Sequence, residues 1–393
     1  MMVGGVAGLL PAKRAGGHVH MQNTLSRDET AEVILTLTRQ VLAAPDVSSA
    51  VRPLLEAFVQ RTAADGGAFF QVDGSVFHAR AAQGDMPTGP AMESILTHGL
   101  PGDTPLLRAL TTSDAPIIVD DTSQSPETAG FPALGVASLA AVPVLDRQGT
   151  LLGAFLAHTF APHAWTESES TFVAATTGTI TGLTARLLAE EAAVAARDGA
   201  LRALGMALDE RDRETKGHTD RVTALALRLG RSLGLDERTL TALRWGAYLH
   251  DIGKVCIPDT VLRKPDQLDE TEWRLIRTHP VLGQSFCAQL PFLPDDSLAV
   301  IRHHHEQWDG NGYPDGLAGE AIPFVARLFA VCDVYDALTS ERWYKQAWTH
   351  GGALAELSSQ AGRKFDPAIV VAFIELAPAP FPNGRTVAGR HLT

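Results

Sequence analysis

The chain has little cysteine, no long apolar run and no surplus of positive charge. Its 393 residues include three cysteines, Cys256, Cys287 and Cys332, and none of them forms a CxxC pair. An odd number without paired spacing argues against a disulfide framework and favours a reducing compartment. The longest segment free of Asp, Glu, Lys and Arg, residues 148–166, contains histidine, threonine and proline, so it is too polar for a transmembrane helix. The net charge of −12 argues against general binding to nucleic acid or membrane surfaces.

The order of charges at the N-terminus differs from that of a secretory signal. The mildly apolar start ends at Leu10, and Lys13 and Arg14 follow it, whereas a signal peptide has its positive charges first. We therefore expect a cytoplasmic protein in which residues 1–27 form a disordered leader, with Met21 as an alternative start.

Lysine and histidine are distributed unevenly, which indicates two different domains. No lysine occurs between Arg14 and Thr215, and half of the 14 histidines lie between His218 and His350. A chain of this length is expected to contain two or three domains at roughly 100–200 residues each.

The first half combines helical and strand patterns. Apolar residues recur at helical spacing over residues 29–44 and 49–63. Short β-rich runs follow, several of them separated by turn residues, and they cover residues 67–72, 75–82, 115–120, 137–146 and 150–160. The last two runs are joined by a polar turn that ends in Gly149, which predicts a hairpin. With a closing helix from about Ser168, the pattern predicts an α+β domain.

The hairpin and the closing helix resemble the end of a GAF domain. The resemblance covers about residues 28–190, and it lies in residues 142–146, 151–156, Phe160 and the helix over residues 166–176. It implies a central antiparallel sheet with flanking helices and a sensor that binds a small molecule or forms a dimer. The sequence leaves both roles open. This half contains no cysteine, which excludes a thioether-linked bilin.

A long helix over residues 168–215, continuous or broken once, is expected to connect the two halves. Residues 168–215 contain no proline, and leucines recur there at mostly helical spacing. The segment over residues 191–213 would be the connection itself, and it could form a parallel dimer seam in a homodimer. The alternative is a single closing helix followed by a loop.

Histidine and carboxylate side chains are concentrated in the second half. Glu214 and His218 are four residues apart and would share one face of a helix. His250 and Asp251 are predicted at the end of a buried helix that stops near Gly253, a typical C-terminal cap residue. A lone histidine is usually an ordinary structural residue, so the argument depends on the combination. The candidate ligands are Glu214, His218, His250, Asp251, His279, His304, His305 and Asp333.

Further helices are predicted to carry the remaining candidates. Asp269 and Glu272 form an N-terminal capping signal for a helix that would carry His279. Residues 295–306 read as a helix ending in three histidines, and residues 325–340 as an apolar helix with Asp333 and Asp336 about one turn apart. A carboxylate in such an apolar helix needs a partner, because an unpaired buried charge is costly.

The ligand types indicate a hydrolytic metal centre. Imidazole and carboxylate suit Fe, Mn or Zn in a catalytic site, whereas structural zinc sites prefer thiolates. The number of candidates exceeds the needs of one ion and indicates two or three.

Several spaced motifs resemble the HD domain and its HD-GYP subfamily over about residues 205–376. The run from His250 to Lys254 (HDIGK) is similar to the HD signature, and residues 304–314 (HHEQWDGNGYP) are similar to the HD-GYP motif. Flanking matches occur in the same order at residues 217–222, 262–265, 279–280, 315–317, 333–339 and 365–367. The resemblance implies an all-α domain over residues 214–376, followed by a tail over residues 377–393.

The resemblance also implies a function: a metal-dependent phosphodiesterase that cleaves cyclic di-GMP to linear pGpG, with the further step to GMP left open. The eight candidates above would be the metal ligands, with Fe or Mn as the expected ions. Glu214 matches the extra ligand of three-metal relatives, and His303 would lie outside the ligand set. Asp251 and Lys254 would act in catalysis.

Cationic and aromatic residues are implied as substrate contacts. Lys254, Arg342 and Lys345 would contact phosphate, and Tyr313 would contact or stack on guanine. Trp343 stands where relatives often have proline. Two alternatives remain: an HD phosphohydrolase for another cyclic dinucleotide, and a weakly active module that docks a diguanylate cyclase domain.

Overall fold

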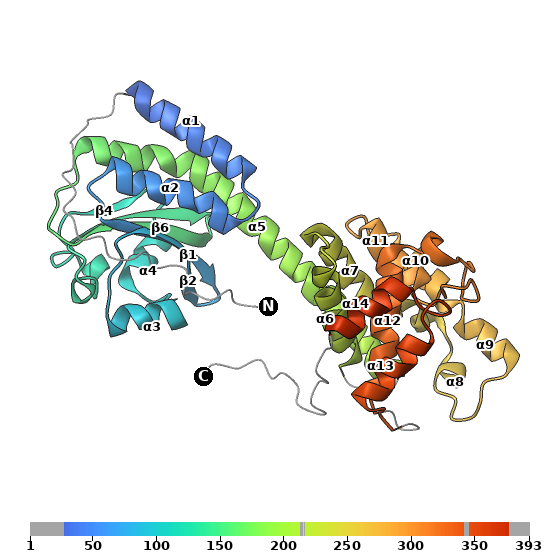
Figure 1. Cartoon of the computed structure of the whole chain (residues 1–393). Coiled ribbons are helices and arrows are strands. Elements are labelled where there is room, and N and C mark those ends of the chain that lie inside the picture. Colours follow the sequence, from blue (N-terminus) through green and yellow to red (C-terminus); the bar gives the residue numbers. More distant parts are fainter. Residues whose placement is uncertain (1–26, 213–214, 216, 342–345, 377–393) are drawn as a thin grey trace. The chain divides into compact units, whose positions relative to one another are not determined.

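The computed structural model describes residues 27–212, 215, 217–341 and 346–376 (Figure 1). The chain divides into two compact units, with the division between Val194 and Ala195. The expected leader, apart from Arg27, and the expected tail lie outside the described residues. Within the described ranges, none of the helices combines the length and apolar character that crossing a bilayer requires.

The first unit is built on an antiparallel six-stranded sheet with the strand order β3-β2-β1-β6-β5-β4. Its strands are β1 (Gly66–Asp73), β2 (Val76–Gly84), β3 (Leu100–Pro101), β4 (Ile117–Val119), β5 (Ser138–Leu145) and β6 (Leu151–Thr159). The five β-rich runs of the sequence correspond to all of these except β3, which is too short to produce a pattern.

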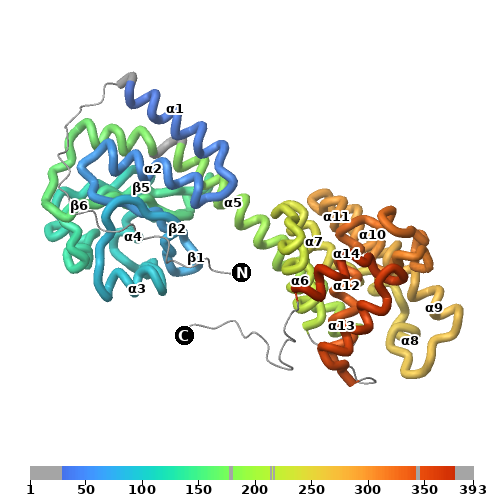
Figure 2. Tube along the Cα trace, in the orientation of Figure 1, coloured from blue at the N-terminus to red at the C-terminus, as the bar shows by residue number. Residues whose placement is uncertain are grey.

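Helices cover both faces of this sheet (Figures 1 and 2). Helices α1 (Arg27–Ala43), α2 (Val47–Arg61) and the start of α5 (Glu167–Asp212) lie on one face, and α3 (Pro90–His98) and α4 (Pro105–Thr111) lie on the other. The neighbouring residues Phe69 and Phe70 enter different apolar clusters because successive side chains of a strand point to opposite faces. The short 3-10 turns η2 (Pro126–Thr128) and η3 (Pro132–Leu134) precede β5.

Strands β5 and β6 form the hairpin that the sequence predicts. One carboxylate oxygen of Asp146 accepts hydrogen bonds from the backbone N–H groups of Gln148 and Thr150, each at 2.8 Å. Gly149 has a φ of +82°, a left-handed conformation that glycine adopts without steric cost. The turn chemistry therefore fixes the register of the two strands.

Helix α5 is continuous over 46 residues and ends at Asp212. Thr215 is not helical, Gly217 has a φ of +77°, and α6 begins at His218. The prediction that the long helix continues to residue 215 is therefore wrong, and so is the prediction that Glu214 and His218 share one helical face. The left-handed conformation at Gly217 ends any continuous helix before His218.

The regular elements described in the second unit are helices. They are α6 (His218–Ser232), α7 (Glu237–Leu249), η4 (Ile252–Cys256), α8 (Asp259–Leu262), α9 (Glu270–Ile276), α10 (His279–Cys287), α11 (Asp295–His303), η5 (Gly319–Ala321), α12 (Phe324–Thr339), α13 (His350–Ser359) and α14 (Pro367–Leu376). Helix α12 lies in the core of this unit, and Leu328, Phe329 and Val331 are completely buried.

Two helix boundaries differ from those predicted. Helix α9 has the expected capping box of Asp269 and Glu272 but ends at Ile276, so His279 begins a separate helix, α10. Helix α7 ends at Leu249, and a 3-10 turn follows it. Gly253 does not cap α7: a Cβ there would overlap the carbonyl oxygen of His279, so glycine is needed for the close approach of η4 to α10.

Candidate metal centre

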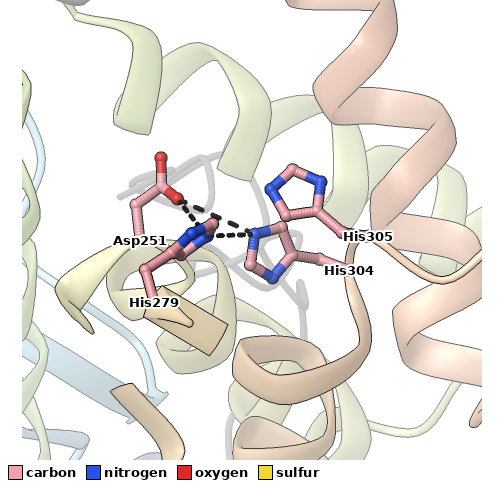
Figure 3. A group of neighbouring side chains, drawn as sticks. All are labelled: Asp251, His279, His304 and His305. Carbon is pink, nitrogen blue, oxygen red and sulfur yellow. Dashed lines mark hydrogen bonds and ion pairs between the residues drawn. The ribbon is translucent and has the colours of Figure 1, made fainter. Parts of the chain in front are cut away.

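The candidate ligands described by the structure converge on one place, and all but Asp333 lie at or just after the end of a helix. His218 begins α6, His279 begins α10, and Asp333 lies within α12. The pair His250–Asp251 follows α7, and the pair His304–His305 follows α11. Figure 3 shows Asp251 and His279 facing His304 and His305.

The ligand atoms form two adjoining groups. In each group the candidate atoms lie within 4.8 Å of one another. The first group consists of Asp251, His279, His304 and His305, and the second of His218, His250 and Asp333. Asp251 joins them, because its Oδ1 lies 3.0 Å from His279 Nε2 and its Oδ2 lies 3.3 Å from His250 Nε2.

Hydrogen bonds orient the histidine rings of both groups. The Nδ1 atoms of His250 and His279 lie 2.8 Å from the carbonyl oxygens of Ala247 and Ile276, and His304 Nδ1 lies 3.0 Å from that of Ile301. A carbonyl oxygen only accepts hydrogen bonds, so Nδ1 carries the proton and Nε2 presents its lone pair. This second contact is the usual way in which proteins orient metal-binding histidines.

Two features of the first group fit a bound cation. Asp251 Oδ1 is buried and has no hydrogen-bond donor among the described residues. The Nε2 atoms of His279 and His304, which both present lone pairs, lie only 3.3 Å apart. A positive ion between these atoms would compensate their mutual repulsion, and imidazole and carboxylate are donors that Fe, Mn and Zn accept.

The electrostatics around Asp251 and His250 also favour positive charge. Burial opposes ionisation of Asp251, but Lys254 and His250 outweigh it and hold the pKa of this carboxyl well below its usual range. Burial lowers the pKa of His250, yet the charge of Asp251 outweighs this effect and raises it to about 9. Nε2 of His250 therefore attracts positive charge, and a proton and a metal ion would compete for this atom.

Lys254 lies between two carboxylates. Its Nζ lies 2.7 Å from Asp251 Oδ2 and 2.5 Å from Asp212 Oδ2, and all three side chains are only 11–13% exposed. Lys254 thus lies beside Asp251, the residue that joins the two candidate ligand groups. Its contact with a substrate phosphate stays a prediction.

Asp336 orients His218 through a contact that the sequence analysis did not assign. Its Oδ2 lies 2.8 Å from His218 Nδ1, and Arg221 donates to Oδ1 at 2.7 Å and to Oδ2 at 2.9 Å. The position of Asp336 in an apolar helix, one turn after Asp333, was the sequence feature that could have indicated a buried partner. Asp212 has no comparable signal, because its partner Lys254 is far away in the sequence.

The glycine-rich loop after α11 contacts the first group through Tyr313. Glu306 is buried and accepts hydrogen bonds from the backbone N–H groups of Asp315 at 2.8 Å and Leu317 at 3.1 Å. The Tyr313 ring stacks on His305 with centroids 4.8 Å apart, and the Arg277 guanidinium lies 5.4 Å from the Tyr313 centroid. Tyr313 is therefore held beside a proposed ligand, where it could contact a bound base.

Some candidates lie outside this arrangement. Glu214, Arg342 and Lys345 belong to the residues that the structure does not describe, so their roles stay predictions. His303 belongs to neither group and lies 3.8 Å from Glu306 and 3.5 Å from Asp315. These three residues form a further group whose candidate ligand atoms lie within 4.8 Å of one another, so the place of His303 outside the ligand set stays a prediction.

Comparisons with known proteins match each half of the chain. A model of the GAF domain matches residues 26–181, and a model of the HD domain matches residues 202–369. The chain is 44% identical over 192 residues to the cyclic di-GMP phosphodiesterase response regulator RpfG of Xanthomonas campestris, covering 48% of this chain and 50% of that protein.

Two other relatives differ from each other in the substrate that their names give. The chain is 41% identical over 179 residues to a cyclic di-GMP phosphodiesterase of Pseudomonas aeruginosa, covering 45% of this chain and 42% of that protein. It is 39% identical over 173 residues to a 3'3'-cGAMP-specific phosphodiesterase of Vibrio cholerae, covering 44% and 33% respectively. The chain thus spans half or less of the length of these relatives.

Proposed function

Because this chain consists of a GAF domain followed by an HD domain with HD-GYP motifs, we propose that it is a metal-dependent phosphodiesterase that hydrolyses cyclic di-GMP to pGpG. The observation that carries the proposal is the pair of adjoining ligand groups joined by Asp251. The relatives named as cyclic di-GMP phosphodiesterases support the substrate. A second hydrolysis would give GMP.

We propose that the two groups hold one ion each, with Fe or Mn as the metal. The residues would be Asp251, His279, His304 and His305 for one ion and His218, His250 and Asp333 for the other, with Asp251 between them. Glu214 would add a ligand for a third ion. When bound, divalent ions supply positive charge that stabilises the phosphoryl oxygens in the transition state.

The remaining polar residues would act on the substrate. Lys254, which lies 2.7 Å from Asp251, would approach a phosphoryl oxygen, and Arg342 and Lys345 would bind the phosphates from outside the ligand groups. Tyr313 would stack on or border a guanine. Its hydroxyl stays protonated, because burial raises the pKa of Tyr313.

Turnover assays test the proposal. Protein loaded with Fe(II) or Mn(II) without oxygen is expected to hydrolyse cyclic di-GMP, and a chelator is expected to abolish the activity until metal is restored. The 39% identity to a 3'3'-cGAMP-specific enzyme favours 3'3'-cGAMP as the second candidate substrate, so both are assayed side by side. Metal-loaded protein that hydrolyses neither dinucleotide would contradict the proposal and favour the docking role.

The GAF domain contains a cavity that we propose as the site of its ligand. The cavity has a volume of about 620 Å³ and lies between the sheet, helix α3 and the segment 129–136 around η3. Its wall is mainly apolar, and Asp103 and His158 are the titratable side chains among its described lining residues. Burial lowers the pKa of His158, so this ring is neutral. No lysine or arginine lines the described wall, which disfavours an anionic ligand such as a cyclic nucleotide.

An uncharged, largely apolar molecule is therefore the expected ligand of this cavity. Mass spectrometry of small molecules released from the purified protein by denaturation is expected to identify such a compound in stoichiometric amount. Release of a cyclic nucleotide, or saturable binding of one to the GAF domain, would contradict the expectation.

A further inference from the structure

The last turns of α5 are part of the HD domain core. Leu201 is buried in one apolar cluster with Tyr248 and Leu249, and Leu208 is also buried. A Cβ at Gly205 would overlap the carbonyl oxygen of Tyr248, so α5 passes unusually close to α7 just before His250. The end of α5 is therefore held firmly beside the metal centre.

Asp209 in α5 holds the segment that carries His218. Its Oδ2 accepts a hydrogen bond from the Thr219 backbone N–H at 3.0 Å, and its Oδ1 accepts one from the Thr219 hydroxyl at 2.7 Å. Both residues are buried, with exposed fractions of 9% and 1%. Two directed bonds to a buried carboxylate fix the backbone next to His218, because breaking either would leave a buried polar group unsatisfied.

The following residues of α5 hold the segment that carries Asp251. Arg211 donates to the carbonyl oxygens of Lys254 at 2.8 Å and of Ile257 at 2.9 Å. Asp212 is paired with the Lys254 ammonium, which in turn contacts Asp251 Oδ2. Lysine has a long flexible side chain, so a second carboxylate is what restricts its ammonium to one place. With Lys254 on Oδ2, Oδ1 of Asp251 is left for the first ligand group.

We propose that Asp209 and Asp212 are positioning residues of the metal centre, each for a different ligand group. Asp209 sets the place of His218 through Thr219, and Asp212 sets the orientation of Asp251 through Lys254. The two carboxylates lie one helical turn apart on α5, so a single turn of this helix controls the spacing between the groups. The inference rests on the proposed function in that these groups hold ions.

The variants Asp209→Asn and Asp212→Asn test the proposal, with Glu210→Ala as the matched control. Glu210 lies between the two residues on the same turn, and its side chain is exposed. Nitrogen-15 signals of the histidine side chains, recorded without metal, are the first measurement. Asp209→Asn is expected to shift the His218 signals and spare those of His279, and Asp212→Asn is expected to do the reverse.

Metal affinity is the second measurement. Loss of an orienting partner typically weakens metal binding by about 10- to 100-fold, so each variant is expected to lose one ion to a graded chelator before the other. Asp209→Glu and Asp212→Glu, which keep the charge, are expected to restore part of the affinity. If Asp209→Asn does not fold, Thr219→Ala removes one of the same two hydrogen bonds.

Signals and affinities that match those of Glu210→Ala in both variants would overturn the proposal. The result is separable from the proposed function. A wild-type protein that binds ions without hydrolysing a cyclic dinucleotide contradicts the function and leaves the positioning test intact. Histidine signals are recorded without metal, so they report on positioning even if the wild-type protein holds no ions.

Discussion

Replacement of Asp251 by alanine is expected to reduce hydrolysis by about a thousand-fold or more. The carboxylate is the residue that joins the two ligand groups, and its buried Oδ1 has no donor in the part of the chain that the structure describes. A metal centre contributes several kcal/mol to stabilising a phosphoryl transition state, and about 4 kcal/mol corresponds to a thousand-fold in rate. Initial rates with cyclic di-GMP, together with the metal content of the protein, measure the effect.

Two further variants separate charge from structure. Asp251→Asn keeps the shape of the side chain but removes its charge, and it is expected to lose metal as Asp251→Ala does. Asp266→Ala removes an exposed carboxylate of the same domain and serves as the control. Circular dichroism establishes that each variant is folded. Near wild-type turnover by folded Asp251→Ala would contradict a centre in which Asp251 serves both groups.

Insertions into α5 between the two domains are expected to change turnover according to helical phase. Val47 N–H and Arg80 contact Glu191, and Arg197 lies 5.2 Å from the Phe292 ring, so insertion after Val194 leaves both sets of contacts in place. Each inserted residue rotates one half of the helix by about 100° relative to the other. Allosteric coupling between sites is typically about 5- to 150-fold in affinity, and we expect changes in rate of this order.

A series of one to four inserted alanines provides the measurement. Coupling predicts that three or four residues, close to a full turn, restore most of the activity that one or two residues remove. The same insertions in a protein that lacks the GAF domain are the control, because no phase dependence is expected there. Equal turnover across the full-length series would mean that α5 only tethers the domains.

The sequence predicts which described side chains converge better than it predicts the contacts that hold them in place. His250 with Asp251 and His304 with His305 are adjacent pairs at helix ends, so local patterns place them correctly. The error at Glu214 and His218 arose because a four-residue spacing was taken as helical, whereas Gly217 adopts a left-handed conformation that ends the helix. His218 itself lies at the start of α6 and belongs to the second ligand group.

Contacts between distant segments were the least predictable part. Asp212 pairs with Lys254, and Glu306 binds the backbone of the glycine-rich loop, and both depend on tertiary packing. The role that the sequence suggests for Gly253, a helix cap, is replaced in the structure by a close approach to His279. A glycine can serve a left-handed backbone conformation or a close approach of two segments, and the sequence alone does not distinguish these roles.

The orienting hydrogen bonds of the histidines have a consequence for how this centre tolerates substitution. His250, His279 and His304 each use the carbonyl oxygen of the residue three positions earlier, and a backbone carbonyl is present whatever side chain occupies that position. These three ligands are therefore insensitive to most changes at Ala247, Ile276 and Ile301. His218 depends instead on the Asp336 side chain, so one point mutation can release it. Substitution of Asp336 is thus expected to loosen the second ligand group at His218 while leaving the ring orientations of His250, His279 and His304 intact.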